Sequence, residues 1–221
     1  MKSFSIIAGS NVNHKMISEA IQLDWISYDD IYQLQVETCY DYFEKNNDIY
    51  IMALDDESNR VIGYINYSPI KESVFTDLVS GSTVDTVITG DDVLPYKDGC
   101  FYWGYFSSIV VHPEYRQHGV ATQMLLHWTN LILRLATERN IYFKKIVADA
   151  VSDVGAHLLS EMGFSFIKPS SHESKIMTLD LFLEIELHSK FKKQFLAIYK
   201  AYCKREEASN VVEKNDAIHA V

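Results

Sequence analysis

The segment 109–122 constrains the fold of this chain more than any other part of the sequence. An apolar run that is typical of a strand stops at Pro113, and a short polar turn then leads into the motif Arg116-x-x-Gly119-x-Ala121 at the start of a long helical pattern. Such a joint presents backbone N–H groups to an anion, with the positive end of the helix dipole behind them. Glycine at this position lets the backbone approach a bulky phosphate, because it has no side chain. The segment therefore predicts a strand, an anion-binding turn and a helix in succession.

Two other phosphate-binding loops do not fit this segment. The dinucleotide fingerprint G-x-G-x-x-G and the Walker sequence Gly-Lys-Ser/Thr are both absent. An ordinary strand–turn–helix joint without a ligand is the remaining alternative, since R-x-x-G-x-A alone occurs by chance. The flanking residues, Val-His-Pro-Glu-Tyr before the motif and Met-Leu-Leu after it, favour the ligand-binding interpretation. With them, the segment resembles the pyrophosphate loop of the GNAT superfamily of acyl-CoA-dependent N-acyltransferases.

The order of elements along the chain also resembles that family. Hydrophobic periodicity predicts the order β-α-α-β-β-β-α-β-α-β-β over roughly 4–183. The resemblance implies an α/β fold with a mixed, mostly antiparallel sheet and one pair of parallel strands that splay apart. Strands are expected at 4–8, 49–54, 61–67, 101–111, 142–150, 164–167 and 175–181, and helices at about 13–23, 28–45, 117–139 and 153–162, with a short helix near 71–79.

Three further segments follow from the pattern. Residues 1–183 are expected to form the GNAT-like domain that the resemblance implies, in which 69–99 is expected to be a long acidic insertion loop. Residues 184–209 are expected to be a C-terminal helical extension that packs on the domain or on a second subunit, so that a homodimer through this helix is one expectation. Residues 210–221 are expected to be disordered.

Composition excludes several classes of protein. The chain has 221 residues, of which 48% are hydrophobic, enough for one packed domain with an extension. It has no run of 18 apolar residues, and its N-terminal apolar stretch is too short for a signal peptide, so no membrane partner is expected. Its three cysteines are odd in number and far apart, which favours free thiols in the cytoplasm. Its eight histidines form no ligand motif, so no metal is expected.

The charge is −10 and unevenly distributed. Residues 24–59 carry ten acids against Lys45 alone, whereas 190–205 carry six bases and no acid. So much negative charge argues against nucleic acid as a partner, including aminoacyl-tRNA. A basic patch formed by the segment 190–205 would keep aminoacyl-tRNA as an alternative. It favours a cationic partner, unless it merely forms a solvated surface that aids solubility.

The family resemblance implies where acetyl-CoA, the co-substrate, binds. The strands 102–111 and 142–150 would splay apart, and the backbone of the first would pair with the pantetheine amides. The loop at 117–122 would hold the pyrophosphate. The cofactor-binding residues implied in this way are Ile109, Val110, Val111, Arg116, Gln117, His118, Gly119, Val120, Ala121, Thr122, Ser152 and His157.

The family's usual proton-transfer residues are not in place. At the strand position where some family members have a catalytic glutamate, this chain has Tyr105. At the position where many members have a tyrosine that acts as general acid, this chain has Leu159, which cannot donate a proton. One interpretation is that other groups act with water, and Tyr105 and Ser108 are the catalytic candidates, although Tyr105 also fits a simply packed strand residue. The other interpretation is a non-catalytic acyl-CoA-binding or interaction module. Asp149, on the splayed strand, would either meet an amine or be solvated.

The expected activity is therefore N-acetyl transfer from acetyl-CoA to a primary amine by direct attack on the thioester. The acceptor is a small-molecule or peptide amine. The acidic segment 24–59 corresponds to the two helices that wall the acceptor site in this family, which favours a cationic acceptor such as a polyamine, an aminoglycoside, or a lysine or N-terminal amine. The insertion 69–99 is expected near the same entrance.

Overall fold

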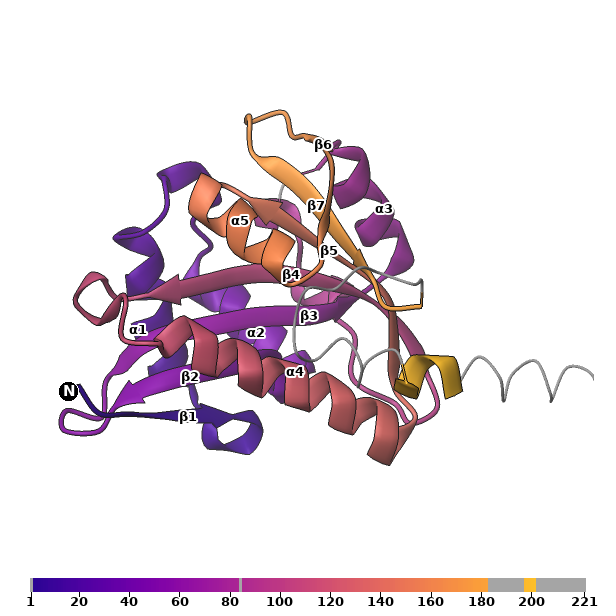
Figure 1. Ribbon diagram of the computed structural model, residues 1–221. Coiled ribbons are helices and arrows are strands. Elements are labelled where there is room, and N and C mark those ends of the chain that lie inside the picture. Colours follow the sequence, from indigo (N-terminus) through magenta and orange to yellow (C-terminus); the bar gives the residue numbers. More distant parts are fainter. Residues whose placement is uncertain (1, 84, 183–196, 202–221) are drawn as a thin grey trace, which may run out of the picture.

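The computed structural model describes residues 2–83, 85–182 and 197–201, and one mixed sheet lies at its centre (Figure 1). The strand order is β1-β2-β3-β4-β5-β7-β6, and every neighbouring pair is antiparallel except β4 and β5. This arrangement confirms the predicted fold class. The strands are β1 (Phe4–Ala8), β2 (Tyr50–Asp55), β3 (Val61–Ile70), β4 (Phe101–Val111), β5 (Tyr142–Ala150), β6 (Ser165–Pro169) and β7 (Lys175–Asp180).

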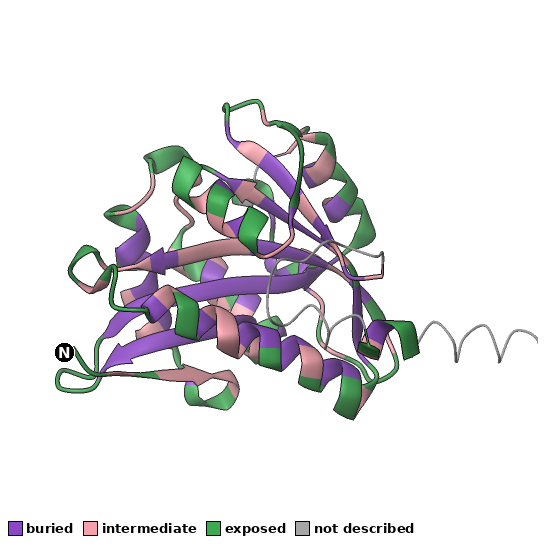
Figure 2. Ribbon diagram, in the orientation of Figure 1, coloured by how far each residue is buried: buried purple, intermediate pink, exposed green. Residues whose placement is uncertain are grey.

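Helices cover both faces of the sheet and create two buried clusters. Strands β2 and β3 are consequently buried along their whole length (Figure 2), and their sequences are almost continuously apolar or aromatic. One face carries α1 (His14–Trp25), α2 (Val36–Lys45) and α3 (Glu72–Ser80); the other carries α4 (Val120–Arg139) and α5 (Asp153–Glu161).

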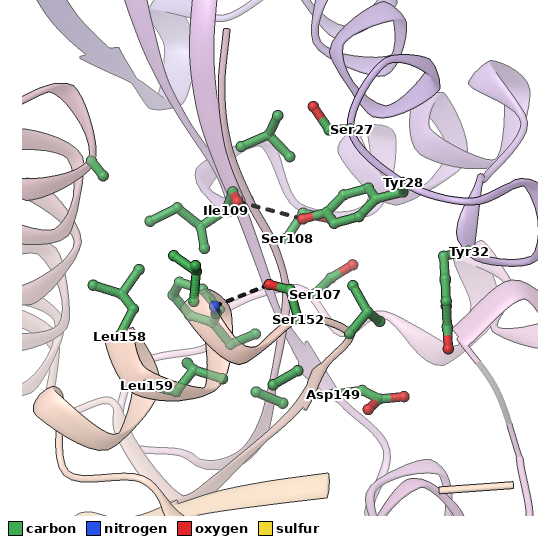
Figure 3. A pocket seen from close by; sticks show the side chains of 18 of the residues that line it. Ser27, Tyr28, Tyr32, Ser107, Ser108, Ile109, Asp149, Ser152, Leu158 and Leu159 are labelled. Carbon is green, nitrogen blue, oxygen red and sulfur yellow. Dashed lines mark hydrogen bonds between the residues drawn. The ribbon is translucent and has the colours of Figure 1, made fainter. Parts of the chain in front are cut away.

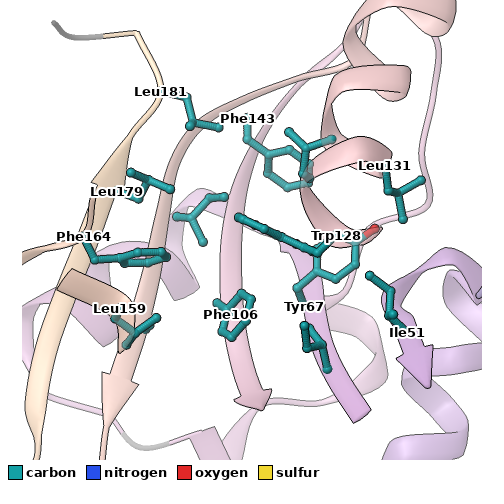
Figure 4. Close-up of a cluster of buried hydrophobic side chains, with 14 of the residues drawn as sticks. Ile51, Tyr67, Phe106, Trp128, Leu131, Phe143, Leu159, Phe164, Leu179 and Leu181 are labelled. Carbon is teal, nitrogen blue, oxygen red and sulfur yellow. The ribbon is translucent and has the colours of Figure 1, made fainter. Parts of the chain in front are cut away.

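The core beneath α4 is built around Trp128 (Figure 4). Its ring lies edge-on to those of Phe106 and Tyr67, with centroid distances of 5.4 and 6.0 Å. Tyr67 and Phe106 are register partners on β3 and β4. Helix α4 therefore packs across β3 and β4 through Trp128.

The helix predicted over 28–45 begins only at Val36, after a 3-10 turn at Asp30–Tyr32. The physical reason is a tertiary contact. Tyr28 belongs to the turn that ends α1, where its N–H donates to the Asp24 carbonyl at 2.8 Å, and its hydroxyl donates a hydrogen bond of 3.4 Å to the carbonyl of Ile109 on β4. The aspartates of the 3-10 turn are weak helix formers, so local propensity does not oppose the change.

The insertion 69–99 is packed against the domain and contains regular structure. The predicted short helix is present as α3, and 3-10 turns follow at Asp85–Val87 and Gly90–Asp92. The Tyr42 hydroxyl of α2 donates a hydrogen bond of 2.7 Å to the carbonyl of Ile88, which is itself buried. The first of these 3-10 turns lies against the turn at Asp30–Tyr32.

Residues 197–201 are helical and pack on the domain. The buried ring of Tyr199 lies 5.3 Å from Tyr142 and 4.9 Å from Phe182, and its hydroxyl accepts a hydrogen bond of 3.2 Å from the Phe143 N–H. The rest of the predicted extension 184–209 and the predicted tail 210–221 lie outside the described residues.

Within the described parts of the chain, no helix is both long and apolar enough to cross a lipid bilayer.

Candidate active site

Strands β4 and β5 separate near the centre of the sheet. Their parallel ladder ends where Phe106 pairs with Ala148, although β4 continues to Val111 and β5 to Ala150. Beyond that pair, the described strands hydrogen-bond to β4 only on its β3 side. One edge of the β4 backbone is therefore left for another partner.

A β-bulge accounts for the separation. Tyr67 on β3 pairs with Phe106, whereas Asn66 pairs with Ser108, so Ser107 is an extra residue in β4. An extra residue bends its strand and increases the local twist. The bulge stands immediately after the last β4–β5 pair, where a bend carries β4 away from β5.

A cavity of about 550 Å³ fills the separation (Figure 3). Its lining comes from both faces of the sheet, because α5 contributes on one face and the segment after α1 contributes on the other. The lining residues are Ser27, Tyr28, Tyr32, Tyr105, Phe106, Ser107, Ser108, Ile109, Val110, Val111, Arg116, Ala121, Ala148, Asp149, Ala150, Val151, Ser152, Val154, Gly155, Leu158 and Leu159.

The predicted phosphate loop is a turn with left-handed backbone. Gln117 and Gly119 have φ values of 65° and 83°, so helix α4 begins at Val120 instead of the predicted 117. In the described structure, Gly119 provides no side-chain cap and the first turn of α4 has no acidic side chain. A Cβ added at Gly119 would meet no described atom within 4 Å. The helix start thus has open space and N–H groups that suit an anion.

Contacts to β2 and β4 hold this loop in place. The Tyr115 hydroxyl donates a hydrogen bond of 2.7 Å to Asp55 at the end of β2. This bond, together with backbone and side-chain bonds from Ser58, lowers the pKa of Asp55 to about 2. Arg116 donates from Nε to the carbonyl of Val111 at 3.2 Å, which fixes its guanidinium at the end of β4.

The two catalytic candidates lie together on β4. Tyr105 and Ser108 both line the cavity, and Tyr105 is buried. Ser108 lies near Tyr64, whose hydroxyl donates a 2.5 Å hydrogen bond to Asp24. Burial raises the pKa of Tyr64 well above its usual value. A row of polar side chains, Ser108, Tyr64 and Asp24, therefore runs from the cavity into the core beneath α1.

Ser152 and His157, the cofactor-binding residues predicted at or near α5, lie in different surroundings. The Ser152 side chain caps α5 by accepting a hydrogen bond of 3.0 Å from the Gly155 N–H, and it lines the cavity. His157 is exposed on α5 and lines a separate hollow beside Phe166. Leu159 is buried and lines the cavity, so no proton donor is present at the position where many family members have tyrosine.

The other residues predicted to bind acetyl-CoA differ in how far their side chains are buried. Ile109, Val111 and Ala121 are half-buried in the cavity wall, and Val110 is buried there. Gln117, His118, Gly119 and Thr122 are exposed around the start of α4, and Val120 is buried. Side-chain burial does not conflict with the predicted role of these residues, because that role belongs to the backbone.

Two tyrosines of the cavity escape prediction from sequence. Tyr28 and Tyr32 line it from the segment after α1 (Figure 3), where periodicity predicts a continuous helix. The available signal is two aromatic rings that flank the pair Asp29-Asp30, which is weak without the fold. Asp29 and Asp30 themselves are exposed and do not line the cavity, and Asp41 packs against Gly90 in the insertion.

The comparisons with known proteins agree with this geometry. A family model described as the acetyltransferase (GNAT) family matches residues 15–164, which is more than half of the chain. The chain therefore belongs to the GNAT acetyltransferase family, and the resemblance seen in its phosphate loop is confirmed. No curated protein matches it in sequence.

Several solved structures share the fold. The NatC complex bound to Gag peptide and CoA has 16% identity and a TM-score of 0.54, with 81% of this chain and 99% of that chain covered. YhbS, a GNAT family N-acetyltransferase from Escherichia coli in complex with CoA, has 16% identity and a TM-score of 0.51, with coverages of 81% and 82%. The loading GNATL domain of CurA from Lyngbya majuscula has 11% identity and a TM-score of 0.54, with coverages of 80% and 98%. At such low identities these similarities concern the fold alone.

Proposed function

We propose that this protein transfers an acetyl group from acetyl-CoA to a primary amine by direct attack of the amine on the thioester. The observation that carries the proposal is the cavity between β4 and β5, lined from both faces of the sheet beside an uncapped helix start. Two substrates can meet in such a cavity from opposite faces. This encounter is what a direct transfer without a covalent intermediate on the protein requires.

The donor side is the face of α4 and α5. The backbone N–H groups of 117–122 would hold the pyrophosphate, assisted by Arg116. The free edge of β4 at Ile109–Val111 would pair with the pantetheine amides, beside Ser152 at the start of α5. The described strands leave this edge of β4 unpaired, although the carbonyls of Ile109 and Val111 accept side-chain hydrogen bonds from Tyr28 and Arg116.

The chemistry needs few groups. The amine nitrogen bonds to the carbonyl carbon, the carbon–sulfur bond breaks, the nitrogen loses a proton and the sulfur gains one. A backbone N–H of β4 near Ile109 stabilises the oxyanion. The row of polar side chains from Ser108 past Tyr64 to Asp24 gives the amine proton a route away from the reaction centre; Tyr105 stands beside it.

A second candidate is supported by Leu159. This side chain lies in the cavity wall at the family's usual position for a proton donor. A protein without that donor can bind acyl-CoA without turning it over. The alternative function is thus a non-catalytic acyl-CoA-binding or interaction module.

Calorimetry and thiol release distinguish these functions. Acetyl-CoA binding is measured for wild type, Gly119→Glu and Gly99→Glu, and thiol release is then followed with pooled primary amines. Gly99 is the matched control: it also has positive φ (75°) and no described atom within 4 Å of an added Cβ, but it precedes the opposite end of β4. We expect only Gly119→Glu to abolish binding, because its carboxylate would repel the pyrophosphate.

Amine-dependent thiol release by wild type supports the transferase. Tight binding without release across the amine panel supports the binding module instead. Absence of acetyl-CoA binding by wild type contradicts both functions. The predicted phosphate loop would then be only an ordinary strand–turn–helix joint.

A further inference from the structure

Asp149 stands at the point where β5 leaves β4. It is the first residue of β5 after the last pair with β4, and it lines the cavity. Side chains alternate between the two faces of a strand, so Asp149 shares the face of Val147, which packs in the cluster beneath α1 and α2. The carboxylate therefore lies on the face where Tyr28 and Tyr32 line the cavity, opposite α5 (Figure 3).

The carboxylate of Asp149 is not fully satisfied by the protein. The buried side chain of Ser174 lies nearby and favours the charged form, but the Oδ1 atom of Asp149 is buried with no hydrogen-bond partner among the described residues. This burial raises the pKa of Asp149 above its usual value. Leaving a buried carboxylate oxygen unpaired costs free energy, and a cation that donates a hydrogen bond would remove that cost.

The turn between β6 and β7 contacts the cavity residue Tyr32 on this face. The Tyr32 hydroxyl donates a hydrogen bond of 3.4 Å to the carbonyl of His172, and the two rings meet edge to face at 6.4 Å. His172 is also close enough to Asp149 for its charge to lower the pKa of that carboxyl. Asp149, Tyr32 and His172, which come from three distant segments, thus lie near one another, and the first two are in the cavity wall.

The charges of the cavity are segregated. In the described structure, Arg116 and Asp149 are the two charged residues among those that line it. Arg116 is fixed at Val111 beside the phosphate loop, whereas Asp149 stands where the strands begin to separate. This arrangement suits an anionic donor at one place and a cationic acceptor at the other.

We propose that Asp149 determines acceptor specificity by accepting a hydrogen bond at Oδ1 from the ammonium group of a cationic amine. The proposal rests on the proposed function, because it assigns the acceptor side of the same cavity. Under this proposal, the single carboxylate of Asp149 in the cavity wall is the main source of acceptor selectivity, and the exposed acids of 24–59 are not. Those exposed acids act only through long-range, salt-screened attraction.

Calorimetry of amine binding tests the assignment without turnover. The protein is saturated with CoA, which carries no acetyl group, and titrated with 1,4-diaminobutane. The variants are Asp149→Asn, which removes the charge at almost constant shape, and Asp30→Asn, which makes the same charge change on the exposed turn outside the cavity. We expect Asp149→Asn to weaken amine binding at least about tenfold and Asp30→Asn to weaken it less than about twofold.

Acetyl-CoA affinity and thermal unfolding of each variant show whether the fold and the donor site are intact. Equal weakening by the two variants overturns the proposal. So does a wild type that binds neither 1,4-diaminobutane nor lysine amide nor a tripeptide amide at millimolar concentration. Thiol release is read separately: amine binding through Asp149 without release refutes only the proposed transferase, and release that is insensitive to Asp149→Asn refutes only this inference.

Discussion

Gly119→Ala tests whether the turn before α4 is a phosphate site or only a joint between elements. Gly119 has φ 83°, a conformation that disfavours any residue with a Cβ, and no described atom lies within 4 Å of the added methyl group. The conformational penalty is about 1 kcal/mol. For a chain of this size, that penalty lowers the Tm by about 2–4 °C.

Gly99→Ala provides the matched comparison. Gly99 has φ 75° and equally open surroundings, so the methyl group there costs a similar free energy of unfolding. Gly99 precedes the opposite end of β4, whereas Gly119 lies between Arg116 and Ala121, which both line the cavity, and belongs to the loop proposed to hold the pyrophosphate. The two variants should therefore be equally destabilised without ligand and should differ in their response to acetyl-CoA.

The response to ligand can be estimated. Loss of one hydrogen bond to an anion weakens binding by about 1.5 kcal/mol or slightly more than tenfold. At an acetyl-CoA concentration of about 100 times the wild-type Kd, ligand stabilises wild type by about 2.7 kcal/mol and a tenfold weaker variant by about 1.4 kcal/mol. Thermal unfolding of Gly119→Ala and Gly99→Ala, each with and without acetyl-CoA, measures this difference. Identical ligand-induced shifts in the two variants would refute the phosphate site.

Three further predictions concern hydrogen bonds. Tyr115→Phe removes the main cause of the low pKa of Asp55, so an NMR titration should show that pKa rising from about 2, and the stability that wild type loses as the pH falls from about 4 toward about 2 should shrink. Because the pKa of Asp149 is raised, amine binding should weaken as the pH falls through that pKa, and calorimetry should find binding by Asp149→Asn insensitive to this change. Tyr199→Phe leaves the Phe143 N–H without its acceptor, so denaturant titration should show a loss of about 1–2 kcal/mol with an unchanged m-value.

Local patterns were sufficient for much of the fold. Every predicted strand is present, and α3 and the Ser152 cap of α5 lie where the sequence indicates. The phosphate loop was recognisable because its requirements are local: a strand, a left-handed glycine and a helix start follow one another within 109–122. Periodicity and turn chemistry depend on neighbours in the chain, so they can be read from the sequence.

Tertiary structure decided the side of the cavity that we propose for the acceptor. The helix predicted over 28–45 begins only at Val36, and Tyr28 instead ends the turn after α1 and donates a hydrogen bond to a carbonyl on β4, 81 residues away. Alternation along β5 identifies the neighbours of Asp149 on its face, but the packing of distant segments around it determines that its carboxylate is buried instead of solvated. Sequence alone therefore identified the family and located the loop that we propose binds the donor, because the contacts of that loop are local. The fold alone positioned Tyr32, Asp149 and the bulge at Ser107, because burial and register depend on contacts between distant parts of the chain.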